Sequence, residues 1–253
     1  MLNGKTALIT GGSSGIGLAT AKLMHENGAR VAITGRDDAS LEKARQAIGG
    51  DVLTLPIDVR SPRDLQTMAS EVKQAFGGLD IFFANAGVAF VTPLATTDEA
   101  QYDELMDTNV KSVFFSIQAI EPVLRQGASI ILNTAWLNHV GVPGRAALSA
   151  SKAAVRSFAR TLSAELLDRR IRVNAVSPGL IETPILRRVG QSEFPGQTEA
   201  DFRKYLDGAS AGIPLGRLGL PEEIAAAVLF LASDASSYML GSEMAVDGGF
   251  GEL

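Results

Sequence analysis

The chain has 253 residues, of which 46% are hydrophobic and 20% charged, so it can bury a large core. Its formal net charge of −5 argues against nucleic acid as the main partner, because phosphate binding needs a basic face. The lack of cysteine excludes disulfides and thiolate catalysis. The sequence has neither an export signal nor an apolar run long enough to cross a bilayer, so we expect a cytoplasmic protein without a membrane partner.

Short apolar runs alternate with stretches of helical period along the whole chain. The predicted strands are 6–10, 30–34, 52–57, 81–85, 129–134, 172–176 and 243–246. They lack polar alternation, as do parallel strands that are buried on both faces. The predicted helices are 17–27, 41–48, 63–76, 100–124, 147–168 and 221–232. We expect one doubly wound Rossmann-type α/β domain over residues 1–253, with a seven-stranded parallel sheet and helices on both faces.

The stretch 183–219 interrupts this alternation. It is rich in glycine and proline and has only a short helical pattern, at 199–206. Long irregular excursions inside compact domains are usually functional, so this stretch predicts a substrate lid. A solvated surface insertion is the alternative interpretation.

A glycine-rich turn joins the first predicted strand to the first predicted helix. Its candidate cofactor-binding residues are Gly11, Ser13, Ser14, Gly15, Ile16 and Gly17. Glycines let the backbone turn tightly and approach a pyrophosphate, whose charge is stabilised by the N–H groups at the helix N-terminus. The turn therefore predicts a dinucleotide site.

The Gly-x-x-x-Gly-x-Gly spacing of this turn resembles the short-chain dehydrogenase/reductase family, classical type. Further motifs resemble that family in order along essentially the whole chain: Asp58-Val59, Asn85-Ala86-Gly87, Asn109, Lys152, Pro178-Gly179 with Ile181 and Thr183, and Asp247-Gly248-Gly249.

The resemblance assigns a role to most of these motifs. It implies that Asp58 and Val59 contact adenine and that Asn85, Ala86 and Gly87 support the adenosine side. It further implies that Lys152 binds the nicotinamide ribose, that Asn109 belongs to the active site, and that the Pro178–Thr183 segment brackets the nicotinamide carboxamide.

The choice of cofactor depends on the end of the second predicted strand. An acidic residue there would bind a ribose 2′-hydroxyl, but this chain has Gly35 followed by Arg36. A guanidinium can pair with a 2′-phosphate, and Ser13 or Ser14 could add hydroxyl donors. The sequence therefore favours NADP(H), with NAD(H) and a solvent-facing Arg36 as the alternative.

Two positions depart from the family's pattern. Leu148, four residues before Lys152, stands where the family has its proton-exchanging tyrosine, and Ala135 stands where it has a substrate-binding serine. Neither side chain has a proton to exchange. His139 is a candidate substitute acid because an imidazole titrates near neutral pH. Tyr205 on the lid and water relayed past Asn109 and Lys152 are the other candidates.

Three functions stay open from these residues. The first is an NADP(H)-dependent oxidoreductase that acts on a small carbonyl, alcohol or imine substrate through an atypical active site. The second is a cofactor-binding protein without turnover, such as a sensor or scaffold. The third is a disabled variant of a carbonyl reductase. No metal site is predicted.

Self-association is expected as well. The predicted helices 100–124 and 147–168 carry apolar residues on more than one face, so they need cover beyond their own sheet. Members of the resembled family pack these helices and the 221–250 region against further copies. We expect a homotetramer, with a dimer as the alternative.

Overall fold

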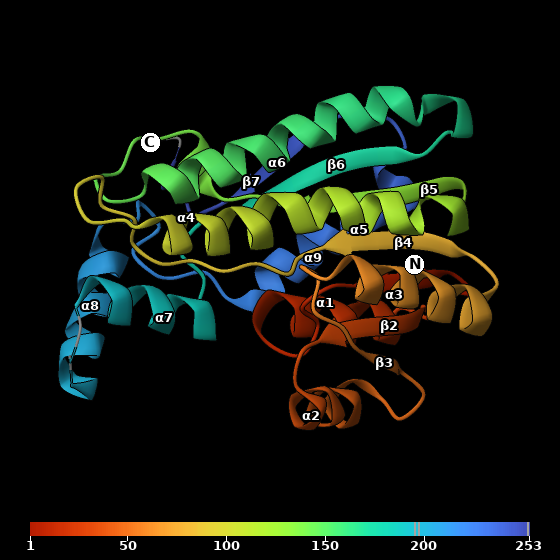
Figure 1. Cartoon of the computed structure of the whole chain (residues 1–253), viewed down its shortest axis with the longest axis horizontal. Helices are drawn as coiled ribbons and strands as arrows, with labels where there is room; N and C mark the ends of the chain where they lie inside the picture. Colours follow the sequence, from red (N-terminus) through yellow and green to blue (C-terminus); the bar gives the residue numbers. More distant parts are fainter. Residues whose placement is uncertain (195, 197, 252) are drawn as a thin grey trace.

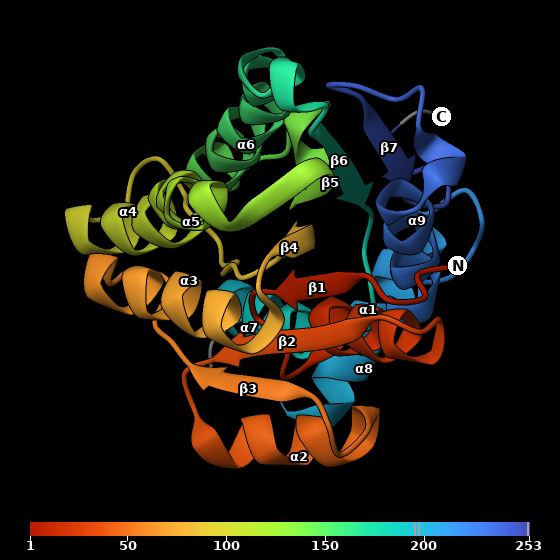
Figure 2. The same cartoon turned by 90° about the vertical axis from the view of Figure 1, so that its right-hand side faces the viewer.

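The computed structural model describes residues 1–253 except 195, 197 and 252. Seven parallel strands form one sheet in the order β3-β2-β1-β4-β5-β6-β7 (Figures 1 and 2). Their bounds are β1 Thr6–Ile9, β2 Arg30–Gly35, β3 Leu53–Pro56, β4 Leu79–Ala84, β5 Leu124–Asn133, β6 Arg172–Pro178 and β7 Glu243–Val246. The predicted seven-stranded parallel sheet is confirmed.

Helices cover both faces of this sheet (Figure 2). On one face lie α1 (Gly15–Glu26), α2 (Asp38–Ile48) and α9 (Pro221–Ala232). The other face carries α3 (Pro62–Phe76), α4 (Glu99–Met106), α5 (Ser112–Ile120) and α6 (Ala146–Glu165). Along β1, Ala7 and Ile9 pack in the hydrophobic core under α1, α2 and α9, whereas Leu8 packs in the core on the opposite face of the sheet. Successive strand residues point to opposite faces.

The prediction of one uninterrupted α-helix over 100–124 is wrong in two ways. A π-helical segment, Asp107–Lys111, lies between α4 and α5, and it carries Asn109. The helix also ends at Ile120, because Pro122 has no N–H to continue the hydrogen-bond ladder. Leu124 already belongs to β5, which begins five residues earlier than predicted.

The stretch 183–219 is more regular than its composition indicates. It contains two helices, α7 (Pro184–Glu193) and α8 (Glu199–Ala211), where the sequence predicts only a short one. A capping box between Thr198 and Asp201 starts α8, and each helix buries an apolar side chain, Leu186 or Phe202. Residues 195 and 197 of the predicted lid lie outside the described residues.

Both helices of this stretch lie beyond the carboxyl ends of the strands, at the left of Figure 1. Among the described residues, no helix is both long enough and apolar enough to cross a membrane.

Candidate active site

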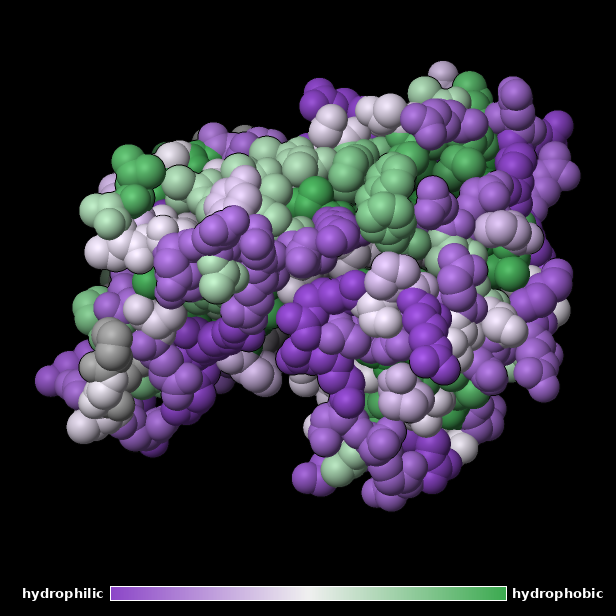
Figure 3. Space-filling view, viewed as in Figure 1, coloured by the Kyte–Doolittle hydropathy of each residue, from purple (hydrophilic) through white to green (hydrophobic). Residues whose placement is uncertain are grey.

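The candidate site lies at the carboxyl edge of the sheet, around the point where the strand order reverses between β1 and β4. Ligands of open α/β sheets bind at such a switch point. In the space-filling view, the surface is hollowed between the α7–α8 block and the N-terminal half of the molecule (Figure 3). The loops that follow β1, β4, β5 and β6 carry many of the predicted site residues, and others lie at the start of α1 and on α6.

The glycine turn brings the backbone close to where the cofactor's phosphates would lie. Gly15 has φ +51°, in the left-handed region, and a Cβ built on Gly17 would lie 2.2 Å from the carbonyl oxygen of Gly11. Ser14 is the N-cap residue of α1, and its side chain makes no capping hydrogen bond. That side chain therefore leaves the first N–H groups of α1 uncapped, and an anion bound at a helix N-terminus needs such uncapped N–H groups.

Asn85 holds the glycine turn in place. Its Nδ2 donates to the carbonyl oxygens of Thr10 and Gly11, at 3.0 and 3.2 Å. Its Oδ1 accepts a hydrogen bond from Nδ2 of Asn133, at 3.0 Å. Thr10 Oγ1 in turn accepts from the backbone N–H groups of Asn85 and Ala86. This side chain therefore links the ends of β1, β4 and β5, and its donors are used within the protein.

At the end of β2, a side chain on Gly35 would crowd its neighbours. A Cβ there would lie 3.1 Å from the Ser13 hydroxyl oxygen and 3.2 Å from Leu41. Arg36 is exposed beside it, and its charge reaches the Asp58 carboxylate. This arrangement places a hydroxyl and a guanidinium where an acidic side chain would select against a 2′-phosphate.

Asp58 is already engaged by the protein. Arg60, which sequence reasoning missed, binds its carboxylate through Nη2 at 2.7 Å and holds the pKa of Asp58 below its ordinary value. Val59 beside it is buried. A basic residue directly after the Asp-Val pair was the only available signal.

Gly87, Asn109 and Lys152 meet at the centre of the site. A Cβ on Gly87 would lie 3.1 Å from Asn109 Oδ1 and 3.9 Å from Lys152 Nζ. Asn109 is 1% exposed, and its amide group binds both the N–H and the carbonyl of Val88, at 2.8 and 2.9 Å. The π-helical segment therefore positions an amide whose hydrogen bonds fix the loop after β4.

Lys152 is the one group of this centre with a shifted pKa. Its Nζ donates to the carbonyl oxygen of Asn133 at 2.9 Å. Burial of the ammonium lowers the pKa of Lys152 from 10.5 to about 8. Desolvation disfavours the charged form, so this lysine can release a proton near neutral pH more readily than an exposed one.

The two atypical positions lie beside this lysine. Leu148, one helical turn before Lys152 on α6, is 4% exposed. It belongs to an apolar cluster, the Leu148 cluster, whose buried members are Val88, Phe90, Leu105, Leu137 and Leu148, with Ala135, Trp136 and Val142 packed against them. The surroundings of Leu148 are therefore apolar.

His139 binds a carboxylate on the far strand. Its Nε2 lies 2.7 Å from Oε2 of Glu243 on β7, and its side chain is 43% exposed. Thr134, Asn138 and Arg156 bind the same carboxylate, which is 5% exposed. This network joins the loop that follows β5 to the strand β7 and the helix α6. It also occupies one ring nitrogen of His139.

Tyr205 of α8 packs within the predicted lid. Its ring stacks on Phe202, with centroids 6.1 Å apart, and meets the edge of Phe194. Burial raises the pKa of Tyr205 above 10, which makes it a weaker acid than a free phenol.

The segment after β6 approaches the glycine turn. Pro178 ends the strand, and the Gly179 N–H donates to Val246 of β7. Ile181 is buried and forms a bridge with Gly219, while Thr183 Cγ2 lies 3.2 Å from a Cβ built on Gly15. The two ends of the predicted lid are therefore joined beside the cofactor turn.

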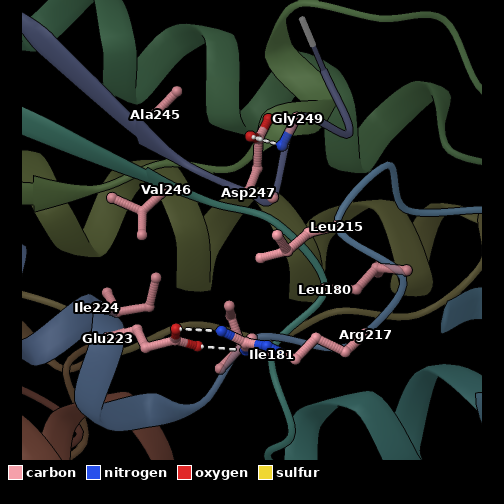
Figure 4. Close-up of a pocket in the computed structure, with 12 residues that line it drawn as sticks. Leu180, Ile181, Leu215, Arg217, Glu223, Ile224, Ala245, Val246, Asp247 and Gly249 are labelled. Atoms are coloured by element: carbon pink, nitrogen blue, oxygen red, sulfur yellow. Dashed lines mark hydrogen bonds and ion pairs between the residues drawn. The ribbon is translucent and has the colours of Figure 1, made fainter. Parts of the chain in front are cut away.

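A cavity of about 310 Å³ lies behind this segment (Figure 4). Apolar side chains of Ile181, Ile224 and Val246 line it, and an ion pair of Arg217 with Glu223, at 2.6 Å, lies on its wall. Of the predicted site residues, only Ile181 contributes to it. The cavity is thus separate from the centre formed by Gly87, Asn109 and Lys152.

Comparisons with known proteins agree with this geometry. A family model described as Enoyl-(Acyl carrier protein) reductase matches residues 11–251. The chain is 39% identical to oxidoreductase asL5 of Sarocladium schorii, over 100% of this chain and 98% of the relative. It is 36% identical to a 3-oxoacyl-acyl-carrier-protein reductase of Thermotoga maritima, over 98% of each. The chain belongs to the short-chain dehydrogenase/reductase family.

Solved structures of the family have the same fold. Levodione reductase superposes with a TM-score of 0.92 at 28% identity, over 98% of both chains. A short-chain type dehydrogenase/reductase from Mycobacterium marinum gives 0.87 at 35% identity, over 100% of this chain and 97% of that one. As a family member, this chain is an oxidoreductase of the short-chain dehydrogenase/reductase type, a family that binds a nicotinamide cofactor.

Proposed function

We propose that this chain is an NADP(H)-dependent oxidoreductase that acts on a small carbonyl, alcohol or imine substrate without the usual tyrosine and serine. The observation that carries the proposal is the preserved arrangement of Asn109 and Lys152 around Gly87, next to an apolar wall at Ala135 and Leu148. Lys152 holds a proton whose pKa is lowered to about 8, so it can stand in as the donor.

The residues present fit a nicotinamide cofactor. The backbone at Gly15 and Gly17 and the N-terminus of α1 would hold the pyrophosphate, and Ser13 with Arg36 would hold a 2′-phosphate. Lys152 would hold the nicotinamide ribose. When bound, the cofactor supplies or accepts a hydride. The part of the protein is to orient the substrate, exclude water and provide the proton.

The apolar wall narrows the class of substrate. Leu148 and its neighbours cannot donate a hydrogen bond to a substrate oxygen, so an ordinary ketone receives little help at that atom. An iminium carbon is already activated and needs no proton at oxygen. Imine substrates are therefore favoured over ketones of the same size.

A second candidate, a cofactor-binding protein without turnover, is favoured by one observation. Leu148 is 4% exposed and packs as a core residue, so this position contributes to packing rather than to an open pocket. The two candidates differ in turnover, and both retain cofactor binding.

One experiment separates them. NADPH binding to the purified protein would be measured by fluorescence, and NADPH oxidation would be followed with matched ketones and cyclic imines. We expect binding together with turnover that is faster on imines. Binding without turnover on either series would support the second candidate, and absence of NADPH binding would contradict both.

Arg36 is expected to determine cofactor preference. NADPH should bind more tightly than NADH, and Arg36→Ala should lower NADPH affinity by about 10- to 100-fold. A charge-assisted hydrogen bond contributes about 1.5–3 kcal/mol to the binding of the 2′-phosphate. NADH has no 2′-phosphate, so the substitution should not lower its affinity. Arg60→Ala, whose guanidinium binds Asp58, is the matched control for a nearby charge. Equal dissociation constants for the two cofactors in the parent would refute the proposal.

Self-association is expected through the α5–α6 face. Apolar surface gathers over these helices in Figure 3. On α5, Phe114 and Phe115 are each 39% exposed, and Phe114 packs against Phe158 of α6. We propose a homotetramer, which light scattering at micromolar concentration would detect as about four times the chain mass. Phe115→Asp should reduce the mass, whereas Leu94→Asp, at a 95% exposed loop residue, should not. A monomeric parent would contradict the proposal.

A further inference from the structure

Arg145 lies where three segments around the Leu148 cluster meet. It is the N-cap residue of α6, three positions before Leu148. Its backbone forms a bridge with Thr92, whose N–H donates to the Gly144 carbonyl at 2.7 Å. From α7, Glu193 Oε2 reaches its Nη2 at 2.7 Å. The guanidinium is therefore enclosed by the loop after β4, the start of α6 and the lid.

Two buried polar atoms at this junction lack partners. The Arg145 side chain is 11% exposed, and its Nη1 has no hydrogen-bond partner among the described residues. The same holds for Oγ1 of Thr92, which is 2% exposed. A buried polar group without a partner costs about 1–3 kcal/mol, and such groups are few in native proteins. Two of them on paired residues indicate a place for a polar group of a ligand.

The chemistry of the junction defines that ligand. A guanidinium donates through planar N–H groups that match a carboxylate, and a hydroxyl can donate to the same anion. The segments that carry Arg145 and Thr92 also contribute Phe90, Val142 and Leu148 to the Leu148 cluster. A ligand that satisfies both parts has an anionic head and an apolar body.

We infer that Arg145 is the anchor of an anion subsite and that the substrate carries a carboxylate on an apolar body. The inference rests on the proposed function, whose substrate it narrows. The Nη1 group of Arg145 binds the carboxylate, while half-buried residues at the edge of the Leu148 cluster, Trp136 and Val142, contact the body. Glu193 competes for the same guanidinium, since its carboxylate is already bound at Nη2. Removal of that competing charge therefore strengthens binding of the substrate.

The test compares an acid with its neutral ester in the NADPH-saturated protein. The probes are 4-oxo-4-phenylbutanoate and its methyl ester, with dissociation constants measured by titration calorimetry. In the parent, the acid should bind about tenfold or more tightly than the ester, the range of one charge-assisted hydrogen bond. Arg145→Met should abolish this preference, Arg145→Lys should keep part of it, and Glu193→Gln should increase it severalfold.

Arg187→Met is the matched control. Arg187 also lies on α7 and carries the same charge, but it binds Glu199, at 2.9 Å, and stacks on Phe202. Its removal therefore leaves Arg145 and the Leu148 cluster intact. It should keep the preference for the acid. Equal binding of acid and ester in the parent would overturn the inference, as would an unchanged preference in Arg145→Met or its loss in Arg187→Met. Failure of the parent to bind NADPH would instead count against the proposed function, and NADPH fluorescence on the same samples reports it separately.

Discussion

The double substitution Ala135→Ser, Leu148→Tyr is expected to raise kcat/KM for ketone reduction by about 10²–10⁴. A positioned general acid contributes roughly 10²–10⁴ in rate and an oxyanion donor about 10²–10³, and losses within one catalytic unit are not additive. Leu148 lies one turn before Lys152 on the same helix, so a tyrosine there would have the lysine as its neighbour. Steady-state kinetics with NADPH and a matched series of ketones would measure the gain.

The control for this prediction is Leu148→Phe. Phenylalanine fills the same space among Val88, Phe90, Leu105 and Leu137 but brings no hydroxyl, so the rate should stay at the parent's value. Each single substitution should recover less than the double one, since the serine and tyrosine of the family act on the same oxygen. If the double variant folds and binds NADPH yet reduces ketones no faster than Leu148→Phe, the rest of the site is not arranged for this chemistry.

Removal of Lys152 is expected to have opposite effects on stability and on cofactor binding. The pKa of Lys152 in the folded protein is about 8, below the 10.5 of an exposed lysine. At about 1.4 kcal/mol per pKa unit, the shift corresponds to a few kcal/mol at most, reduced where water reaches the side chain. Lys152→Met should therefore stabilise the cofactor-free protein at pH 7, while it weakens NADPH binding about tenfold or more.

The pH dependence has a defined sign. Below pH 8 the lysine is protonated in both the folded and the unfolded state, and the full cost of burying its charge is present. Between pH 8 and 10.5 the unfolded chain binds more protons than the folded one, so the parent's free energy of unfolding should rise with pH. The difference in that free energy between parent and Lys152→Met, from urea unfolding at several pH values, should shrink across this window. A constant difference would contradict the lowered pKa.

The pH dependence of turnover is an independent test of the lowered pKa of Lys152. If Lys152 supplies the proton, carbonyl reduction should fall as the pH rises through about 8, because a general acid must be protonated. His139→Ala is the matched control, since its ring nitrogen is bound to Glu243. It should leave the rate and pH profile unchanged. Loss of the fall in rate with rising pH in that variant would instead identify His139 as the acid.

The sequence by itself determined the fold and the order of the cofactor elements. Strands such as Thr6–Ile9 and Arg172–Pro178 are short, apolar and bounded by turn residues, so their pattern is local. The glycine turn is equally local, because the tight backbone near Gly17 excludes any larger side chain within a few residues of the strand. Properties of this kind can be read without knowing what lies across the sheet.

Local reading failed where a distant contact or a competing local signal decided the outcome. The π-helical segment that carries Asn109 is stabilised by hydrogen bonds from Asn109 to Val88. The two residues are far apart in the chain, so a local hydrophobic pattern cannot predict this contact. Pro122 ends the long helix although the apolar pattern runs on into β5. The two lid helices form in a glycine-rich stretch because Pro184 starts α7, Thr198 caps α8, and both helices have apolar residues to bury.

Only the tertiary structure decided the electrostatics of the site. The sequence marks Lys152 by resemblance, but its lowered pKa follows from burial, and burial depends on segments that are far apart in the chain. The same holds for His139, whose partner Glu243 lies 104 residues away, and for Arg145, which Glu193 reaches from the lid. Charges interact through space and are screened by whatever surrounds them, so their state is a property of the folded molecule rather than of the order of residues.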